Sequence, residues 1–193
     1  AYLAPGDAQA QPVEPAVAPA QPSMASGTPS PTMLARFQAA AKAAQAPDAG
    51  QRATAIVTLQ ELAADATASS ALRHEALFRI AQARELDKAH PSLTLDAYRL
   101  ALAAQPGGAH VSAIELRIAA LLAGQNDTRG ARQILEPLAE RLEPLPREMQ
   151  SEVLTQLAAA LAKDGDAAGS AACTVRMIDK GLAANEAQEI QLL

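Results

Sequence analysis

Three histidines are the residues of this chain best suited to holding a metal ion or acting as a general base. His74, His90 and His110 stand far apart, and the stretch HEALF, which begins at His74, has no second histidine four residues later. A pair at that spacing would place two imidazoles on one turn of a helix. We therefore predict no metal site. A hydrolase that uses His74 or Glu136 is kept as an alternative to the two interpretations of function given below.

A second candidate is the acidic stretch DGDAAGSAACTV, which begins like a calcium-binding loop. Asp164 and Asp166 occupy early ligand positions, and Gly169 stands where such a loop turns sharply. However, Ala168 and Val175 replace a third ligand and the final bidentate glutamate. The stretch is better explained as the capped start of a helix.

The other reactive side chains also have structural explanations. Cys173 lies among alanines with no histidine nearby in the sequence, which predicts a small buried apolar residue and not a nucleophile. The acid pair Glu136 and Glu140 stands beside Arg132 and Arg141, as on a solvated helix face with ion pairs. The sequence has no glycine-rich phosphate loop. We predict that the chain is not an enzyme and binds no cofactor.

The composition predicts an all-α domain, so helices must position these side chains. Hydrophobic residues make up 49% of the 193, yet there is no Trp and only two Tyr and two Phe. Alanine, the strongest helix former, dominates the apolar residues, whereas a sheet would need Val, Ile, Thr and aromatic residues. A net charge of −5 without a Lys- or Arg-rich stripe argues against nucleic-acid binding. No uncharged apolar run reaches the ~18 residues of a membrane span.

Residues 1–30 differ in composition from the rest of the chain. Six prolines are spread among Ala, Gln, Ser and Gly, and the stretch has no Lys or Arg. Proline fixes φ and removes a backbone donor, so we predict a disordered, extended linker ahead of a helical domain at 31–193. Spacers of this kind often join an envelope anchor or signal sequence to a domain. We therefore expect a periplasmic or outer-envelope location with membrane tethering upstream of residue 1, and a cytoplasmic location is the alternative.

Eight helices joined by short turns are predicted in the domain. Ser30 can cap the first helix, and Pro31 suits its first position, where a missing N–H costs nothing. Short linkers force consecutive helices to be antiparallel. The predicted spans are 32–46, 51–66, 71–87, 93–105, 110–124, 128–142, 147–163 and 167–180, and a short ninth helix is considered at 184–193.

A repeat organises these helices. The stretches TLDAYRLALAAQP from Thr94, ARQILEPLAERL from Ala131 and SAACTVRMIDKGL from Ser170 each begin on a small residue and start 37 or 39 residues apart. A larger residue follows four positions later, and apolar or small residues follow at seven and eight, which puts them on one helical face. A weaker copy begins near Ala55. A period of this size is typical of stacked helical hairpins.

The helices that precede these stretches repeat as well. LFRIAQARE, LRIAALLAGQND and LTQLAAALAKDGD each carry a small residue after Ile or Leu, at Ala81, Ala119 and Ala158. With these paired helices, and with Pro106 twelve residues after Thr94, the chain resembles the tetratricopeptide-repeat (TPR) family over roughly residues 71–181.

The chain departs from the family pattern at several positions. Apart from Phe78, the large aromatic residue of the first helix is missing, and the repeats exceed the usual 34 residues. Pro137 falls inside a second helix, where it removes a hydrogen bond to the carbonyl of Gln133, at about 3 kcal/mol in a regular helix interior, so we expect a kink. A related alanine-rich helical array is the alternative.

The resemblance implies a concave groove, lined by the first helices, that receives a peptide or a helix of a partner protein. The lining is apolar in the middle and acidic toward each end, and it lacks the inward Lys, Arg and Asn with which the family clamps a terminal carboxylate. Such a lining implies an apolar or weakly basic ligand. The alternative is that its alanines only pack against the next repeat. The implied positions are Glu75, Phe78, Gln82 and Glu85, then Ala113, Leu116, Ala120 and Ala123, then Glu152, Thr155 and Ala159.

Two interpretations of function follow. The first is a protein-interaction adaptor of the bacterial envelope, in which the flexible linker keeps the domain at a high effective concentration near its anchor. The second is a structural subunit of a larger envelope assembly, or the helical, non-catalytic part of a cell-wall enzyme system. A monomer that captures a defined partner would favour the first, and stoichiometric self-assembly would favour the second.

Overall fold

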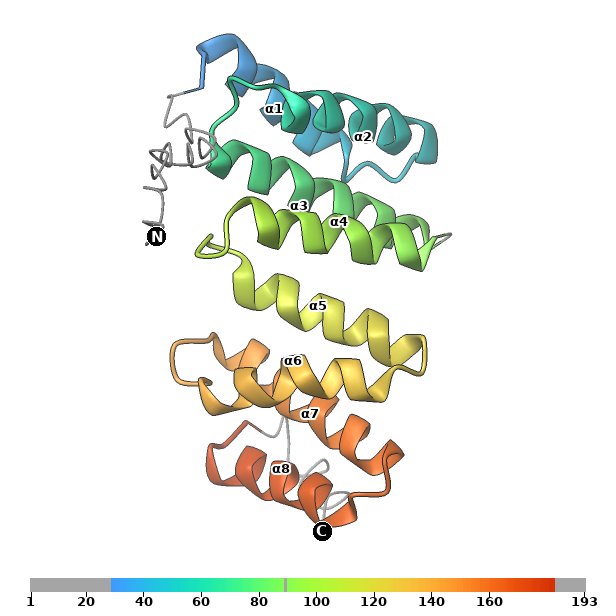
Figure 1. Ribbon diagram of the computed structural model, residues 1–193, viewed down its shortest axis with the longest axis vertical. Coiled ribbons are helices and arrows are strands. Elements are labelled where there is room, and N and C mark those ends of the chain that lie inside the picture. The colour runs from blue at the N-terminus through green and yellow to red at the C-terminus, as the bar shows by residue number, and fades with distance from the viewer. Residues whose placement is uncertain (1–28, 89, 183–193) are drawn as a thin grey trace, which may run out of the picture.

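The computed structural model describes residues 29–88 and 90–182, and all regular secondary structure in these ranges is helical (Figure 1). The all-α prediction is confirmed, and the predicted helix ends agree with the observed ones to within three residues. Residues 1–28 of the predicted linker and the ninth helix considered at 184–193 lie outside the described residues. The helices are α1 (Pro31–Ala43), α2 (Ala49–Ala64), α3 (Ser70–Asp87), α4 (Pro91–Ala104), α5 (Val111–Gly124), α6 (Thr128–Glu140), α7 (Arg147–Lys163) and α8 (Ala167–Asp179).

Consecutive helices pair into four hairpins that stack along one direction, which confirms the predicted stacked-hairpin architecture (Figure 1). Every helix contacts its successor, and two pairs of first helices also meet, α1 with α3 and α5 with α7. The smallest contact between consecutive helices is that of α4 with α5. None of the described helices is both long and apolar enough to cross a lipid bilayer.

One continuous core runs through the four hairpins, and alanine supplies many of its closest contacts. Ala81 and Ala119 of the first helices are fully buried, as are Ala101 and Ala131 of the second helices. A methyl side chain lets two helix backbones approach without leaving a void, which explains how so few aromatic residues suffice.

The helix α6 places its apolar stripe in the core. Leu135, Leu138 and Leu142 are all buried, although Leu142 lies just beyond the end of the helix. The helix continues through Pro137 to Glu140, so the proline does not end it. Pro137 and Gln133 are both exposed, and only the Gln133 carbonyl loses its helical donor.

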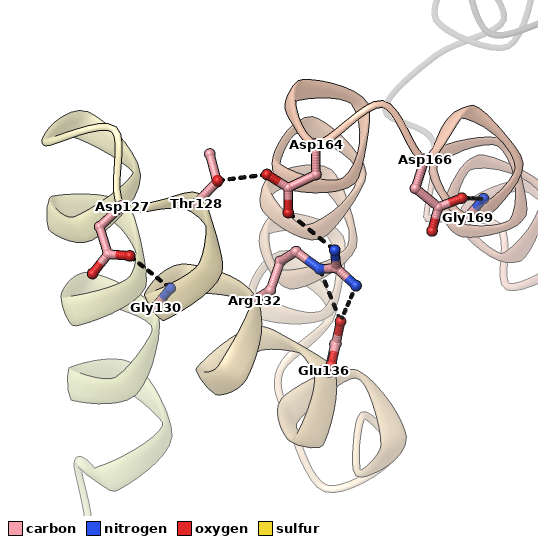
Figure 2. A network of polar contacts seen from close by, with 8 residues as sticks. All are labelled: Asp127, Thr128, Gly130, Arg132, Glu136, Asp164, Asp166 and Gly169. Atoms are coloured by element: carbon pink, nitrogen blue, oxygen red, sulfur yellow. Dashed lines mark hydrogen bonds and ion pairs between the residues drawn. The ribbon is translucent and has the colours of Figure 1, made fainter.

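Side chains at the helix starts explain why the helices begin where they do. Ser30, Asp48 and Ser69 each accept a hydrogen bond from the backbone N–H three residues later. The last two hairpins repeat one version of this cap, in which Asp127 accepts from the N–H of Gly130 and Asp166 accepts from that of Gly169 (Figure 2). A Cβ atom at either glycine would overlap the capping carboxylate. The pattern Asp-x-x-Gly is therefore a structural mark of the repeat.

This overlap predicts a different outcome for two Gly to Ala changes. At Gly124, where a Cβ would meet nothing within 4 Å, alanine should stabilise the fold by up to about 1 kcal/mol through reduced chain entropy. At Gly130 the same gain should be offset by the loss of the Asp127 cap, about 1 kcal/mol. Urea unfolding should therefore give the Gly130→Ala chain a free energy of unfolding about 1 kcal/mol lower than that of the Gly124→Ala chain.

A background that lacks the cap provides the control for this prediction. In an Asp127→Ala chain, Gly130→Ala should stabilise as much as Gly124→Ala does, because no carboxylate remains to be displaced. Equal stabilisation by the two alanines in the chain that keeps Asp127 would show that the Asp127 cap does not require a glycine at position 130.

Candidate functional site

A chain of charged side chains connects the first helices of three consecutive hairpins. The Arg117 guanidinium of α5 lies 3.8 Å from a carboxylate oxygen of Glu85 on α3 and 3.9 Å from one of Glu152 on α7. All three side chains are partly exposed. They define one surface, here named the α3–α5–α7 face, that crosses two hairpin junctions.

A pocket of about 560 Å³ opens on this face where α3, α4 and α5 meet. Phe78, Tyr98, Leu86 and Ala113 supply its apolar wall. Its volume falls within the range of ligand-binding cavities, roughly 300–1,000 Å³. The complete lining of this α3–α5 pocket is Gln45, Phe78, Gln82, Glu85, Leu86, Lys88, Tyr98, Ala113 and Arg117.

Aromatic rings are concentrated behind the pocket. The Phe78 ring stacks on His110 with centroids 4.5 Å apart, and His110 in turn lies parallel to His74 at 6.1 Å. Tyr98 approaches Phe78 at 6.2 Å. One of the two Phe and one of the two Tyr in the sequence therefore meet at this junction. This junction therefore concentrates aromatic packing in a core that is otherwise mostly aliphatic.

Each polar group in this cluster has a defined partner, with one exception. The Tyr98 hydroxyl donates to Glu85 at 2.6 Å, and burial, together with the Glu85 carboxylate, raises the pKa of Tyr98. His110 lies 3.0 Å from a Glu75 oxygen, and Nδ1 of His74 lies 2.8 Å from the carbonyl oxygen of Ala101. Nε2 of His74 is buried without a hydrogen-bond partner.

The histidine separation in the sequence gave no sign that His74 and His110 would meet. His110 immediately precedes α5, and the stacking of α5 beside α3 brings the two rings together. No group of three or more His, Cys, Asp or Glu side chains is placed to hold a metal ion within residues 29–88 and 90–182. The two rings stack at the hairpin junction, where Nδ1 of His74 contacts the Ala101 carbonyl oxygen and Nε2 of His110 pairs with Glu75.

The residues implied for the groove do not share one environment. Phe78, Gln82 and Glu85 come together at the α3–α5 pocket, and Ala113 joins them from α5. Glu75 lies one turn before Phe78, where it pairs with Arg79 at 2.9 Å. Glu152, Ala120 and Ala123 are half-buried, and Thr155 and Ala159 are exposed.

Two of these positions belong mainly to the core. Leu116 is only 3% exposed and Phe78 only 6%, and both contribute to the central hydrophobic cluster. Beside Leu116 stands the exposed Arg117, which the repeat alignment did not place in the groove. The implied groove positions contain no cation, whereas the pocket lining includes two, Arg117 and Lys88. The neighbouring charges that attract Arg117 lie on other helices, so no local pattern identified it.

The side chains that the sequence analysis set aside as structural have structural partners. Asp164 accepts from Thr128 and from Arg132, and these hydrogen bonds lower the pKa of its carboxyl group (Figure 2). Arg132 also pairs with Glu136 at 2.8 Å. Asp166 caps α8, as predicted for the calcium-like stretch. Cys173 is buried, and this burial raises the pKa of its thiol, which disfavours the nucleophilic thiolate.

A second hollow, of about 600 Å³, lies between α1 and α2. Its floor consists of alanines, including the buried Ala40 and Ala55, and Arg36 and Asp48 stand among its polar residues. None of the groove positions implied by the sequence lines it.

No protein-family model matches the sequence, and no curated protein matches it significantly. Its fold is nevertheless similar to solved structures. Two crystal structures of nearly identical TPR-like repeats, described as a kinesin light chain from Podosopora anserina, superpose with TM-scores of 0.62 and 0.61. Each is 14% identical in sequence, and the matches cover 83% of this chain and 81% or 82% of the other. This similarity establishes the fold, and it confirms the TPR-like helical repeat that the sequence resemblance implied.

Proposed function

Since this chain has a TPR-like helical repeat fold, we propose that it is a non-enzymatic adaptor or scaffold that binds a peptide or a helix of a partner protein on the α3–α5–α7 face. Stacked hairpins commonly serve protein-protein interaction, because successive units build an extended surface with pockets between them. The ion pairs of Arg117 with Glu85 and Glu152 carry this proposal. They indicate that three first helices form one continuous surface beside an open pocket.

A bulky charge in the pocket tests the proposal. Ala113 is half-buried in the wall of the α3–α5 pocket, so Ala113→Arg would obstruct the pocket without entering the core. Ala103→Arg is the matched control, because Ala103 is exposed on α4 and does not line the pocket. Affinity capture with cross-linking from native extract should recover a partner with the Ala103→Arg chain and lose at least about 90% of it with Ala113→Arg, the effect of ~1.4 kcal/mol in binding.

Charges at Phe78 or Leu116 are unsuitable for this experiment, because both side chains are buried and such variants would unfold. Cross-links from the captured partner should fall on α3, α5 or α7. Equal capture by both arginine variants, or cross-links confined to α4, α6 and α8, would contradict binding on the α3–α5–α7 face. Stoichiometric self-assembly unaffected by either variant would favour the structural-subunit alternative.

We further propose that the adaptor acts in the bacterial envelope, tethered upstream of residue 1. The Ala-, Pro- and Gln-rich composition of residues 1–30 supports this location, since such spacers extend a domain away from its anchor. Fractionation of the source cells should recover the chain with the periplasm or the membranes. Recovery in the cytoplasmic fraction alone would overturn this part of the proposal and leave the adaptor role unaffected.

A further inference from the structure

We infer that the α3–α5 pocket binds a bulky apolar side chain of the partner segment, and that a Lys or Arg close to it in the same segment enters between Glu85 and Glu152. This inference rests on the proposed adaptor function and specifies its ligand. The segment is therefore apolar and basic, and the pocket with its two flanking carboxylates decides which segments bind.

The pocket wall supplies the apolar half of this specificity. The lining includes the edges of Phe78 and Tyr98, which are only 6% and 1% exposed, together with the half-buried Ala113. Leu86, also in the lining, is 55% exposed although it is a large apolar residue. An exposed leucine in a pocket lining gains from being covered by another apolar side chain.

Two carboxylates that share one cation supply the basic half. Arg117 lies 3.8 Å from Glu85 and 3.9 Å from Glu152, beyond the 2.7–3.2 Å of a direct N–H to O hydrogen bond. Its single charge stands between two negative ones, and all three side chains are between 37% and 49% exposed. A second guanidinium or ammonium from the ligand would complete the pairing.

Other charges near the pocket do not change this assignment. Glu75 is already paired, with Arg79 at 2.9 Å and with His110 at 3.0 Å. Lys88 lines the pocket at the end of α3, where the helix dipole favours a cation.

Selection from a random-peptide phage library on the full chain provides the first measurement. Enriched peptides should share a Leu, Met, Ile or aromatic residue next to or near a Lys or Arg. A synthetic copy of one enriched peptide, labelled for fluorescence polarisation, then reports affinity. Ala113→Arg should abolish its binding, and a higher salt concentration should weaken it.

Variants of the charged side chains test the basic half through effects of opposite sign. Glu85→Gln and Glu152→Gln should each weaken binding about two- to fivefold, the effect of one partly exposed ion pair. Glu140→Gln on α6 is the matched control and should leave affinity unchanged, because Glu140 lies on a second helix outside the pocket lining. Arg117→Gln should tighten binding about two- to fivefold, since it frees both carboxylates for the cation of the ligand.

The outcomes separate this inference from the adaptor proposal. Enrichment of acidic peptides, together with weaker binding to the Arg117→Gln chain, would overturn the inference while peptide binding on this face stands. Apolar and basic peptides that bind the Ala113→Arg chain normally would contradict the pocket itself. If no peptide is enriched, the inference fails, and the capture experiment with native extract decides the adaptor role independently.

Discussion

Leu116→Asp is expected to unfold the centre of the array, at a cost of more than about 4 kcal/mol. Leu116 is only 3% exposed and belongs to the hydrophobic cluster that runs through all four hairpins. Aspartate at this position would either bury a charge without a partner or force α5 to move away from its neighbours. Thermal unfolding followed by far-UV circular dichroism should show this loss directly.

The matched control is Leu100→Asp on α4, because Leu100 is 57% exposed. The same substitution there should change the free energy of unfolding by no more than about 0.5 kcal/mol. Since each hairpin of a stacked array depends only on its neighbours, hydrogen exchange in the Leu116→Asp chain should accelerate most in α5 and the adjoining helices. Uniform acceleration over all the described helices would contradict this local coupling, and a stable Leu116→Asp chain would contradict the burial of Leu116.

Arg52→Met should destabilise the fold by about 2–4 kcal/mol, because it removes a buried guanidinium that joins three segments. Arg52 Nε donates to a carboxylate oxygen of Asp87 at 2.8 Å, at the end of α3. Its Nη1 donates to the carbonyl oxygens of Ala46 and Pro47 at 2.8 and 2.7 Å, in the turn between α1 and α2. Methionine would fill most of the volume, yet it would leave the carboxylate and both carbonyls without these donors.

Arg52→Met should cost less than the full loss of a buried ion pair. The Asp87 side chain is 31% exposed, so water can partly replace the hydrogen bonds of Arg52. Arg36→Met is the matched control. Arg36 pairs with Glu61 at 3.1 Å, but both side chains are more than half exposed, so the loss should stay below about 1 kcal/mol. Equal urea midpoints for the two methionine variants would show that Arg52 makes no special contribution.

The helices of this fold could be predicted from local features of the sequence. Ser30 and Asp127 act as helix caps in the structure through hydrogen bonds to backbone groups only three residues away, so their role depends on neighbours in the chain. The buried stripe of Ala131, Leu135 and Leu138 follows from helical spacing in the same way. The recurrence of these features then indicated stacked hairpins.

The candidate site could be predicted only in part. The repeat alignment selected Phe78, Gln82 and Glu85, which do line one pocket, because they share a face of a single helix. It selected Leu116 and not Arg117, although the two are adjacent, because helical spacing alone did not distinguish the side of α5 that packs against its neighbours from the exposed side that carries Arg117. The contact of His74 with His110 had no sequence signal either, because it depends on how α3 packs against the start of α5.

The sequence by itself therefore determined where helices begin and end, which stripe of each is apolar, and that the hairpins repeat. These properties depend on interactions within one or two helical turns. Only the tertiary structure decided which side chains of α3, α4, α5 and α7 meet. The rotation of each helix against its neighbours sets the 3.8 and 3.9 Å approaches of Arg117 and the position of the α3–α5 pocket. That rotation results from the packing of side chains between hairpins, which the spacing of residues along one helix does not specify.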